Sequence, residues 1–278
     1  MIFQDNNHIM PIKPETYLKS VNYVGLSNNI KNFLSILRIK QHIICNNILI
    51  DVDNNLNTIF DLSTYETYLP SIHKNIYIRN SWRFAIFDSD KNLDKIINNY
   101  FSLLFQDFNE YIFFKNFKNN CIDFIYRPDL LHDIYINYST IFNEIKIKDN
   151  IHQTIELFSK KYFNKNTISI HLRSWVDCPE RQKHFNIDNF YNKISEFNNG
   201  INTFFISSDD KVICNNIKKK FGDVIITYES TENLSIINDL IELMLLSKNN
   251  ILFGSYMSTF TEMAYIINYS YEKQIYIL

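Results

Sequence analysis

Two patterns of apolar and polar positions alternate along the second half of this chain. Short apolar runs, typical of buried strands, occupy residues 167–173, 202–210, 223–228 and 249–256. Stretches with apolar residues three or four positions apart, which predict amphipathic helices, occupy residues 151–162, 187–197, 211–221, 237–248 and 257–268. Strands and helices that alternate at this spacing predict a parallel sheet with helices on both faces.

The first half contains one organised segment and one long stretch that the pattern does not assign. Apolar residues at helical spacing after a turn at Gly25 predict a helix over 30–43, and the apolar run 46–53 predicts a buried strand. Residues 55–150 mix aromatic runs with polar loops and contain no repeat. We therefore predict an α/β protein of two domains with a boundary near residue 155.

Composition excludes several classes of protein. The net charge of -2 lacks the basic excess of nucleic-acid-binding proteins, so no nucleic-acid partner is expected. No apolar run approaches the roughly 20 residues of a transmembrane helix, and residues 1–15 do not resemble a signal peptide. The four cysteines are scattered without a CxxC pair. We expect a soluble cytoplasmic protein with free thiols and no zinc site.

Glycine is scarce, and this limits how the chain can bind a nucleotide. Only four glycines occur in 278 residues, which excludes the glycine-rich phosphate loops of dinucleotide-binding proteins and of P-loop proteins. A bound phosphate must therefore be held by side chains or by isolated backbone amides.

Polar side chains lie at the carboxyl ends of three of the four predicted strands in the second half, or directly after them. They are His171, Arg173, Asp209, Asp210, Ser258 and Thr259. Because ligands of open parallel sheets bind where the strands end, we expect these residues to lie close together. Arg173 can bind diphosphate oxygens through its planar guanidinium, and the helix start after Ser258 can donate hydroxyl and amide groups to a phosphate. A nearby carboxylate can accept from a base or a ribose, so the set suits a nucleoside diphosphate.

Each of these residues also has a purely structural interpretation. Arg173 can form a surface ion pair, and His171 can be a hydrogen-bonded core histidine. Asp209 and Asp210 can cap the following helix, and the pair Ser258-Thr259 can do the same for the last one. These alternatives stay open at the level of sequence.

Three segments, in order, resemble the fucosyltransferase superfamily that includes protein O-fucosyltransferases, α-1,6-fucosyltransferases and rhizobial nodulation fucosyltransferases. Residues 25–41 resemble its glycine-asparagine loop and first helix. Residues 168–194 resemble its HxR segment, and residues 239–267 resemble its final motif of an acid, an apolar helix, a strand and a Ser-Thr-Phe turn. Residues 55–150 match weakly, if at all.

The resemblance implies a GT-B-like α/β fold, with two Rossmann-like domains facing across a cleft. Residues 1–155 would form the acceptor side and residues 156–278 the nucleotide-sugar side. It implies an enzyme that transfers fucose from GDP-fucose to a hydroxyl of a glycan or protein, with inversion and without a metal or other cofactor. The alternatives are a transferase with another nucleotide-sugar donor and a non-catalytic relative that binds nucleotides or glycans.

The resemblance also implies roles for individual residues. Arg173 would hold the donor diphosphate and stabilise the departing GDP, and Phe260 would complete the phosphate-binding turn of Ser258 and Thr259. Asn28 would lie near the donor. Glu242 stands where the family usually has an aspartate that contacts guanine, and this departure puts the guanine preference in doubt.

The remaining positions concern the loop after Arg173 and an early acidic pair. His171 and Asp177 match motif positions of the family. Glu180 lies where α-1,6 members place a catalytic glutamate, with different spacing, so it is either the general base or a solvated acid. Ser174 replaces a second arginine of many members, which favours the O-fucosyltransferase-like branch. Asp51-Val52-Asp53 resembles a metal-binding DxD motif, which we reject because it ends an early strand of a chain that otherwise resembles GT-B proteins.

Overall fold

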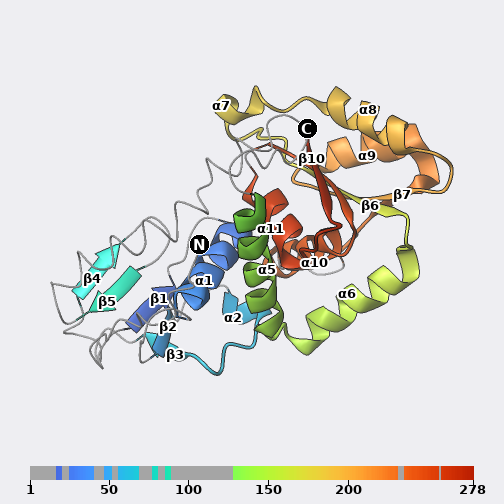
Figure 1. Cartoon of the computed structure of the whole chain (residues 1–278). Coiled ribbons are helices and arrows are strands. Elements are labelled where there is room, and N and C mark those ends of the chain that lie inside the picture. The colour runs from blue at the N-terminus through green and yellow to red at the C-terminus, as the bar shows by residue number, and fades with distance from the viewer. Residues whose placement is uncertain are drawn as a thin grey trace. The chain divides into compact units, whose positions relative to one another are not determined.

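The chain divides into two compact units, which we describe separately. The computed structural model describes residues 17–20, 25–40, 47–51, 56–68, 77–80, 85–88, 128–230, 235–256 and 258–278 (Figure 1). The first unit comprises Met1–Asn109 and Asp129–Lys148, and the second comprises Glu110–Pro128 and Asp149–Leu278. The assignment of an acceptor side and a donor side, with a boundary near residue 155, stays a prediction.

The second unit is built on a five-stranded parallel sheet. Its strands are β6 (Thr167–Leu172), β7 (Thr203–Ser208), β8 (Ile225–Thr227), β9 (Ile251–Gly254) and β10 (Gln274–Ile277). They lie in the order β10-β9-β6-β7-β8, and every neighbouring pair is parallel. All six residues of the central strand β6 are buried, because the strand has neighbours on both sides and helices on both faces. The predicted parallel sheet is therefore confirmed, and β10 adds an unpredicted edge strand.

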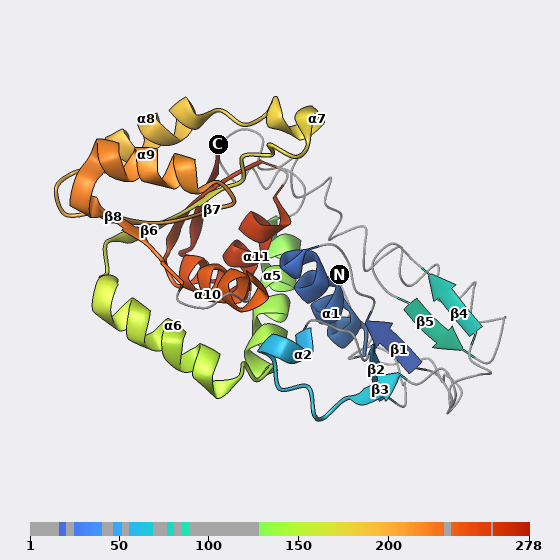
Figure 2. The same ribbon diagram turned by 180° about the vertical axis from the view of Figure 1, so that it is seen from behind.

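Helices cover both faces of this sheet. The helices of this unit are α6 (Asp149–Tyr162), α7 (Pro179–Gln182), α8 (Ile187–Phe197), α9 (Lys211–Phe221), α10 (Ser235–Ser247) and α11 (Thr259–Ile267), with a 3-10 turn at Gly222–Val224. Of these, α7 is a short helix in the loop after β6 and has no buried residue. Figure 1 and, from behind, Figure 2 show α8 and α9 on one face and α10 and α11 on the other. The predicted helices of this half are confirmed.

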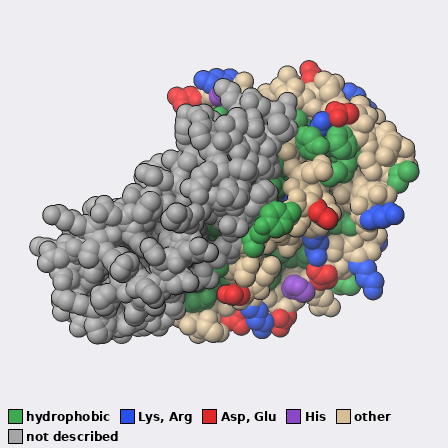
Figure 3. Space-filling model, viewed as in Figure 1, with side chains coloured by type: hydrophobic (Ala, Val, Ile, Leu, Met, Phe, Trp, Pro, Cys, Tyr) green, Lys and Arg blue, Asp and Glu red, His purple; other side chains and the backbone are tan. Residues whose placement is uncertain are grey.

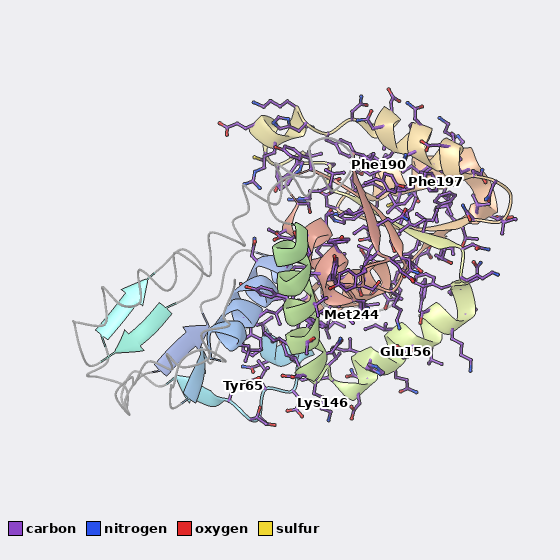
Figure 4. All side chains as sticks on the ribbon, in the orientation of Figure 1. Tyr65, Lys146, Glu156, Phe190, Phe197 and Met244 are labelled. Carbon is purple, nitrogen blue, oxygen red and sulfur yellow. The ribbon has the colours of Figure 1, made fainter. Side chains whose placement is uncertain are left out.

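Successive side chains of β6 point to opposite faces of the sheet. Ile168 and Ile170 pack in a buried cluster with Phe190 of α8, and Phe197 of the same helix meets Phe253 edge-on at 5.2 Å (Figure 4). On the opposite face the Ser169 hydroxyl donates to the Leu246 carbonyl of α10 at 2.7 Å. This period-two pattern directs His171, two residues beyond Ser169, to the face of α10 and α11.

Short polar side chains fix where two of these helices begin. The Asp210 carboxylate accepts from the Val212 and Ile213 amides at the start of α9, and Asn186 accepts from the Asp188 amide at the start of α8. Gly222, with a φ of 70°, ends α9 in a conformation that favours glycine.

The first unit contains a mixed sheet. Its strands are β1 (Tyr17–Ser20), β2 (Asn47–Asp51), β3 (Glu66–Tyr68), β4 (Tyr77–Asn80) and β5 (Ala85–Asp88), in the order β3-β2-β1-β5-β4. Strands β1, β2 and β3 are parallel, whereas β5 runs antiparallel to β1 and β4. Its helices are α1 (Leu26–Lys40), α2 (Leu56–Ile59) and α5 (Pro128–Glu144). The predicted helix and strand near the N-terminus correspond to α1 and β2.

The described surface carries charges of both signs. On the face that Figure 3 shows, Lys and Arg side chains and Asp and Glu side chains are both scattered over the coloured part. Within the described ranges, no helix has the length and apolarity needed to cross a bilayer.

Candidate functional site

The loops that follow β6 and β9 are joined at the carboxyl edge of the parallel sheet. His171 is the register neighbour of Gly254, so the two strands end side by side. The Arg173 amide donates to the Ser255 hydroxyl at 2.8 Å, and that hydroxyl donates to the His171 carbonyl at 3.3 Å. The ends of β6 and β9 therefore lie close together, as the sequence predicted, and the Ser255 hydroxyl links them.

Arg173 lies at this edge between two carboxylates. Its guanidinium forms ion pairs with Asp209, at the end of β7, and with Asp177 at 3.1 Å. Asp209 also accepts from the Ser174 amide at 2.9 Å and from its hydroxyl at 3.2 Å. The side chain of Asp209 is 23% exposed and that of Asp177 is 70% exposed, so Asp209 holds the guanidinium more firmly and a ligand can displace Asp177 more easily.

Trp175 lies beneath the Arg173 guanidinium, and sequence reasoning did not select it. Its ring centroid is 4.9 Å from the guanidinium carbon of Arg173 and 4.7 Å from that of Arg181. Its indole N–H donates to the Tyr256 carbonyl at 3.3 Å, which attaches the ring to the loop after β9. Trp175 has a φ of 55°, a rare value for an aromatic residue. An aromatic residue inside an otherwise polar loop was the available sequence signal.

His171 is a buried, uncharged histidine. Its Nδ1 lies 2.7 Å from the Thr261 hydroxyl, and its ring stacks on Phe260 with centroids 4.8 Å apart. Burial, with Arg173 as a second cause, lowers the pKa of His171 to about 3. The imidazole is therefore neutral at physiological pH, and its contacts are those of the hydrogen-bonded core histidine that sequence left as an alternative.

The start of α11 approaches the end of β9 very closely. The Ser258 hydroxyl accepts from the Thr261 amide at 3.4 Å and caps the helix, while Thr259 and Phe260 are half-buried. A Cβ atom at Gly254 would overlap the Thr261 methyl group, so this contact requires glycine. The first turn of α11 is thus held against the strand ends that carry His171 and Arg173.

A second carboxylate lies beside the end of β7. Glu242 of α10 accepts a hydrogen bond from the Ser207 hydroxyl. Burial raises the pKa of Glu242 to about 7, with Asp239 adding to the increase, while the Ser207 hydrogen bond and Lys211 oppose it. This carboxyl therefore titrates near neutral pH. Burial raises the pKa of the Cys214 thiol to about 12, and the carboxylates of Glu242, Asp210 and Asp209 add to the increase, while a hydrogen bond with Ser208 opposes it.

Other predicted residues do not join the Arg173 cluster in this structure. The Asp210 side chain caps α9, as the structural interpretation expected. Glu180 is exposed on α7, and within the described residues no hydrogen bond or ion pair links it to Arg173. Asn28 lies in α1 of the first unit, and its place near the donor stays a prediction. Asp51 ends β2, and Asp53 lies outside the described residues.

No model of a known protein family and no curated protein matches this chain. Solved structures do match. NodZ α-1,6-fucosyltransferase soaked with GDP-fucose aligns with a TM-score of 0.56 and 14% identity, over 91% of this chain and 92% of its own. An Arabidopsis thaliana FUT1 mutant in complex with GDP aligns with a TM-score of 0.53 and 13% identity, over 91% of this chain and 69% of its own.

This chain has a fucosyltransferase-like fold. Fucosyltransferase NodZ from Bradyrhizobium gives the same result, with a TM-score of 0.53, 14% identity and coverage of 91% of this chain and 93% of its own. The likeness confirms the predicted GT-B-like α/β fold. At these identities it shows the fold alone, so the function rests on the chemistry of the site.

Proposed function

We propose that this protein is a glycosyltransferase that uses GDP-fucose and transfers fucose to a hydroxyl of a glycan or protein. One observation carries the proposal: Arg173 and the start of α11 are held together at the carboxyl edge of a parallel sheet. Nucleotides bind at this place in open α/β sheets. The solved structures with the same fold include one soaked with GDP-fucose and one in complex with GDP, which supports the choice of donor.

Arg173 would act on the leaving group. As the bond between the sugar and the diphosphate breaks, negative charge grows on the oxygens of the departing phosphate. A fixed guanidinium and the amides of a helix N-terminus stabilise that charge more in the transition state than in the ground state. This arrangement supplies the positive charge without a metal ion, and we propose a metal-independent, inverting displacement.

Donor binding would exchange one carboxylate for a phosphate. Asp209 is held by the amide and hydroxyl of Ser174, whereas the side chain of Asp177 is 70% exposed and, among the described residues, bonds to Arg173 alone. We therefore assign Asp209 to orienting the guanidinium and expect the diphosphate to displace Asp177. Phosphate oxygens would then accept from the Nη2 group of Arg173, which in this structure donates to both carboxylate oxygens of Asp177.

Glu242 would recognise the base. A carboxylate accepts two hydrogen bonds from adjacent N–H donors, which guanine presents on one edge and uracil does not. The Ser207 hydroxyl keeps the carboxyl oriented beside the end of β7. Glu242 is one methylene longer than the aspartate that the family usually has, but it carries the same carboxylate. We therefore expect it to select guanine over uracil.

Transfer also needs a proton acceptor for the attacking hydroxyl. We assign this role to Glu180, which is exposed in the loop after β6 and free to meet an incoming acceptor. Replacement of Glu180 by Gln should then reduce turnover more than donor affinity. An unchanged rate in that variant would remove Glu180 from the mechanism.

The test combines donor binding with turnover. GDP should raise the thermal midpoint of the protein more than UDP does, since a ligand that binds only the native state stabilises it. Arg173→Ala should abolish transfer from GDP-fucose while the protein stays folded. Lys248→Ala is the matched control, because Lys248 pairs with Glu156 after α10, at the opposite end of the strands. Stabilisation by UDP alone would reject the donor, and normal turnover of Arg173→Ala would reject the mechanism.

A further inference from the structure

Two arginines share one tryptophan ring in the loop after β6. The guanidinium carbons of Arg173 and Arg181 lie 4.9 Å and 4.7 Å from the centroid of Trp175. The two cations are therefore no further apart than the sum of these distances, although like charges repel. Cation-π attraction to a ring fixed by its N–H bond to Tyr256 offsets part of that repulsion.

The loop is folded so that Arg181 returns over Trp175. The Cys178 amide donates to the Trp175 carbonyl at 2.9 Å, and the Arg181 amide donates to the Cys178 carbonyl at 3.0 Å. These two consecutive turns bring Arg181 back beside the ring. A further contact, between the rings of His184 and Tyr256 at 5.3 Å, holds the end of the loop against the segment that leads to α11.

A second cation beside Arg173 would offset its two carboxylates when a diphosphate approaches. Arg173 faces the carboxylates of Asp177 and Asp209, so these three groups carry a net negative charge. An anionic ligand would be repelled by that set. Arg181 is half-buried, and within the described ranges it forms no ion pair with a carboxylate. With the positive charge of Arg181 added, the four groups Arg173, Arg181, Asp177 and Asp209 are neutral together, even before a ligand displaces Asp177.

We propose that Arg181 binds the diphosphate of the donor together with Arg173, with Trp175 as their common support. The proposal rests on the proposed function and adds a residue that neither sequence reasoning nor fold likeness assigns. The aromatic ring occupies the flat face of each guanidinium. The N–H groups lie in the plane of the guanidinium, so those of Arg181 can donate to phosphate oxygens, and those of Arg173 can do so once Asp177 is displaced.

Titration calorimetry with GDP tests this role. Arg181→Gln should weaken GDP binding about tenfold or more, the effect expected for loss of a charge-assisted hydrogen bond. It should also flatten the dependence of affinity on ionic strength. Lys183→Gln removes the same charge from an exposed side chain two residues away and should leave affinity within about twofold. Equal GDP affinity in the wild type and Arg181→Gln would overturn the proposal.

Binding of inorganic pyrophosphate distinguishes the proposed role of Arg181 from the proposal that GDP-fucose is the donor. If the wild type binds pyrophosphate but shows no preference for GDP over UDP, the donor assignment fails, and weaker pyrophosphate binding by Arg181→Gln still supports Arg181. If the wild type binds none of these anions, both proposals are overturned. Guanosine, which lacks phosphates, is the structural control: its affinity should not change in Arg181→Gln, and an equal loss for guanosine and GDP would overturn the role of Arg181.

A fluorescence measurement gives an independent readout. Trp175 and Trp82 are the two tryptophans of the chain, so Trp82→Phe leaves Trp175 as the sole indole reporter. Pyrophosphate should change its emission by drawing both guanidinium groups toward the anion. Adding Arg181→Gln should reduce this change in emission. An equal change with and without Arg181 would contradict the proposal that Trp175 supports both arginines.

Discussion

The contact between Gly254 and Thr261 offers a sharp test of how the site is held. Gly254 ends β9, and a Cβ atom there would overlap the Thr261 methyl group in the first turn of α11. Both neighbours of this contact are fixed, because Gly254 pairs with His171 in the sheet and the Thr261 hydroxyl lies 2.7 Å from His171 Nδ1. Gly254→Ala must therefore move the helix start or rotate the threonine.

The magnitude follows from the two consequences of that change. Overpacking of a well-packed interior typically costs about 1–3 kcal/mol. Rotation of Thr261 would also leave the buried His171 nitrogen without its partner, at a further cost of about 1–3 kcal/mol. Rotation of Thr261 relieves part of the overlap when it breaks the hydrogen bond, so the two costs do not add in full. We therefore expect Gly254→Ala to lower the free energy of unfolding by roughly 2–4 kcal/mol.

Thr261→Ser provides the matched rescue. Serine keeps the hydroxyl that faces His171 and removes the methyl group that a new Cβ atom would meet. Alone, it should cost about 1 kcal/mol for the lost buried methyl. In the presence of Gly254→Ala it should recover most of the loss, which gives a coupling free energy of about 1–3 kcal/mol in a double-mutant cycle.

Urea unfolding of the four proteins measures these quantities, and GDP titration on the same samples reports on the site. Gly254→Ala should weaken GDP binding, because the start of α11 shifts away from Arg173. The double variant should bind GDP more tightly than Gly254→Ala alone. If Gly254→Ala unfolds with the wild-type free energy, or if Thr261→Ser gives no rescue, the argument that α11 is held by this contact is refuted.

Three further predictions concern titration and metal ions. Because the pKa of Glu242 is raised to about 7, its ionised form is gained as pH rises through 7. If that form accepts from guanine N–H groups as proposed, GDP affinity should increase from pH 6 to pH 8, and Glu242→Gln should remove this dependence. Burial lowers the pKa of Lys273 from 10.5 to about 7, so between these values the native state binds fewer protons than the unfolded chain, and stability should rise with pH by up to about 1.4 kcal/mol per unit. Urea unfolding at pH 7.5 and 9 should show a flatter slope for Lys273→Met, although this change also leaves the Ser247 and Ala264 carbonyls without their donor. An unchanged slope would contradict the lowered pKa of Lys273. Transfer from GDP-fucose should persist in EDTA, and complete loss that returns with added metal would contradict a metal-independent mechanism.

Local pattern was sufficient for the layers of the second unit. Each apolar run there is short and lies between helices with one apolar face, so β6, β7, β8 and β9 could be located without coordinates. The first unit was harder to predict. Strands β4 and β5 pair antiparallel and are four residues each, and α5 lies within the stretch 55–150 that showed no clear period.

The partners of the site residues could not be predicted in the same way. Sequence reasoning placed His171 and Arg173 at a sheet edge, but it left open whether each was structural or functional. The structure gives His171 a structural partner in Thr261, ninety positions away, and gives Arg173 a partner in Asp209, thirty-six positions away. It also assigns Asp210 to a helix cap, while Asp209 beside it faces the arginine.

The amino-acid sequence by itself determined that this protein is α/β, that its second half is a parallel sheet between helices, and which polar residues follow the strands. Periodicity carries that information, because it depends only on which face of an element is buried. Only the tertiary structure decided that Trp175 supports two arginines, that Glu242 titrates near neutral pH and that Gly254 must lack a side chain. Those properties depend on distances of a few ångströms between distant segments, and spacing along a chain does not specify such distances.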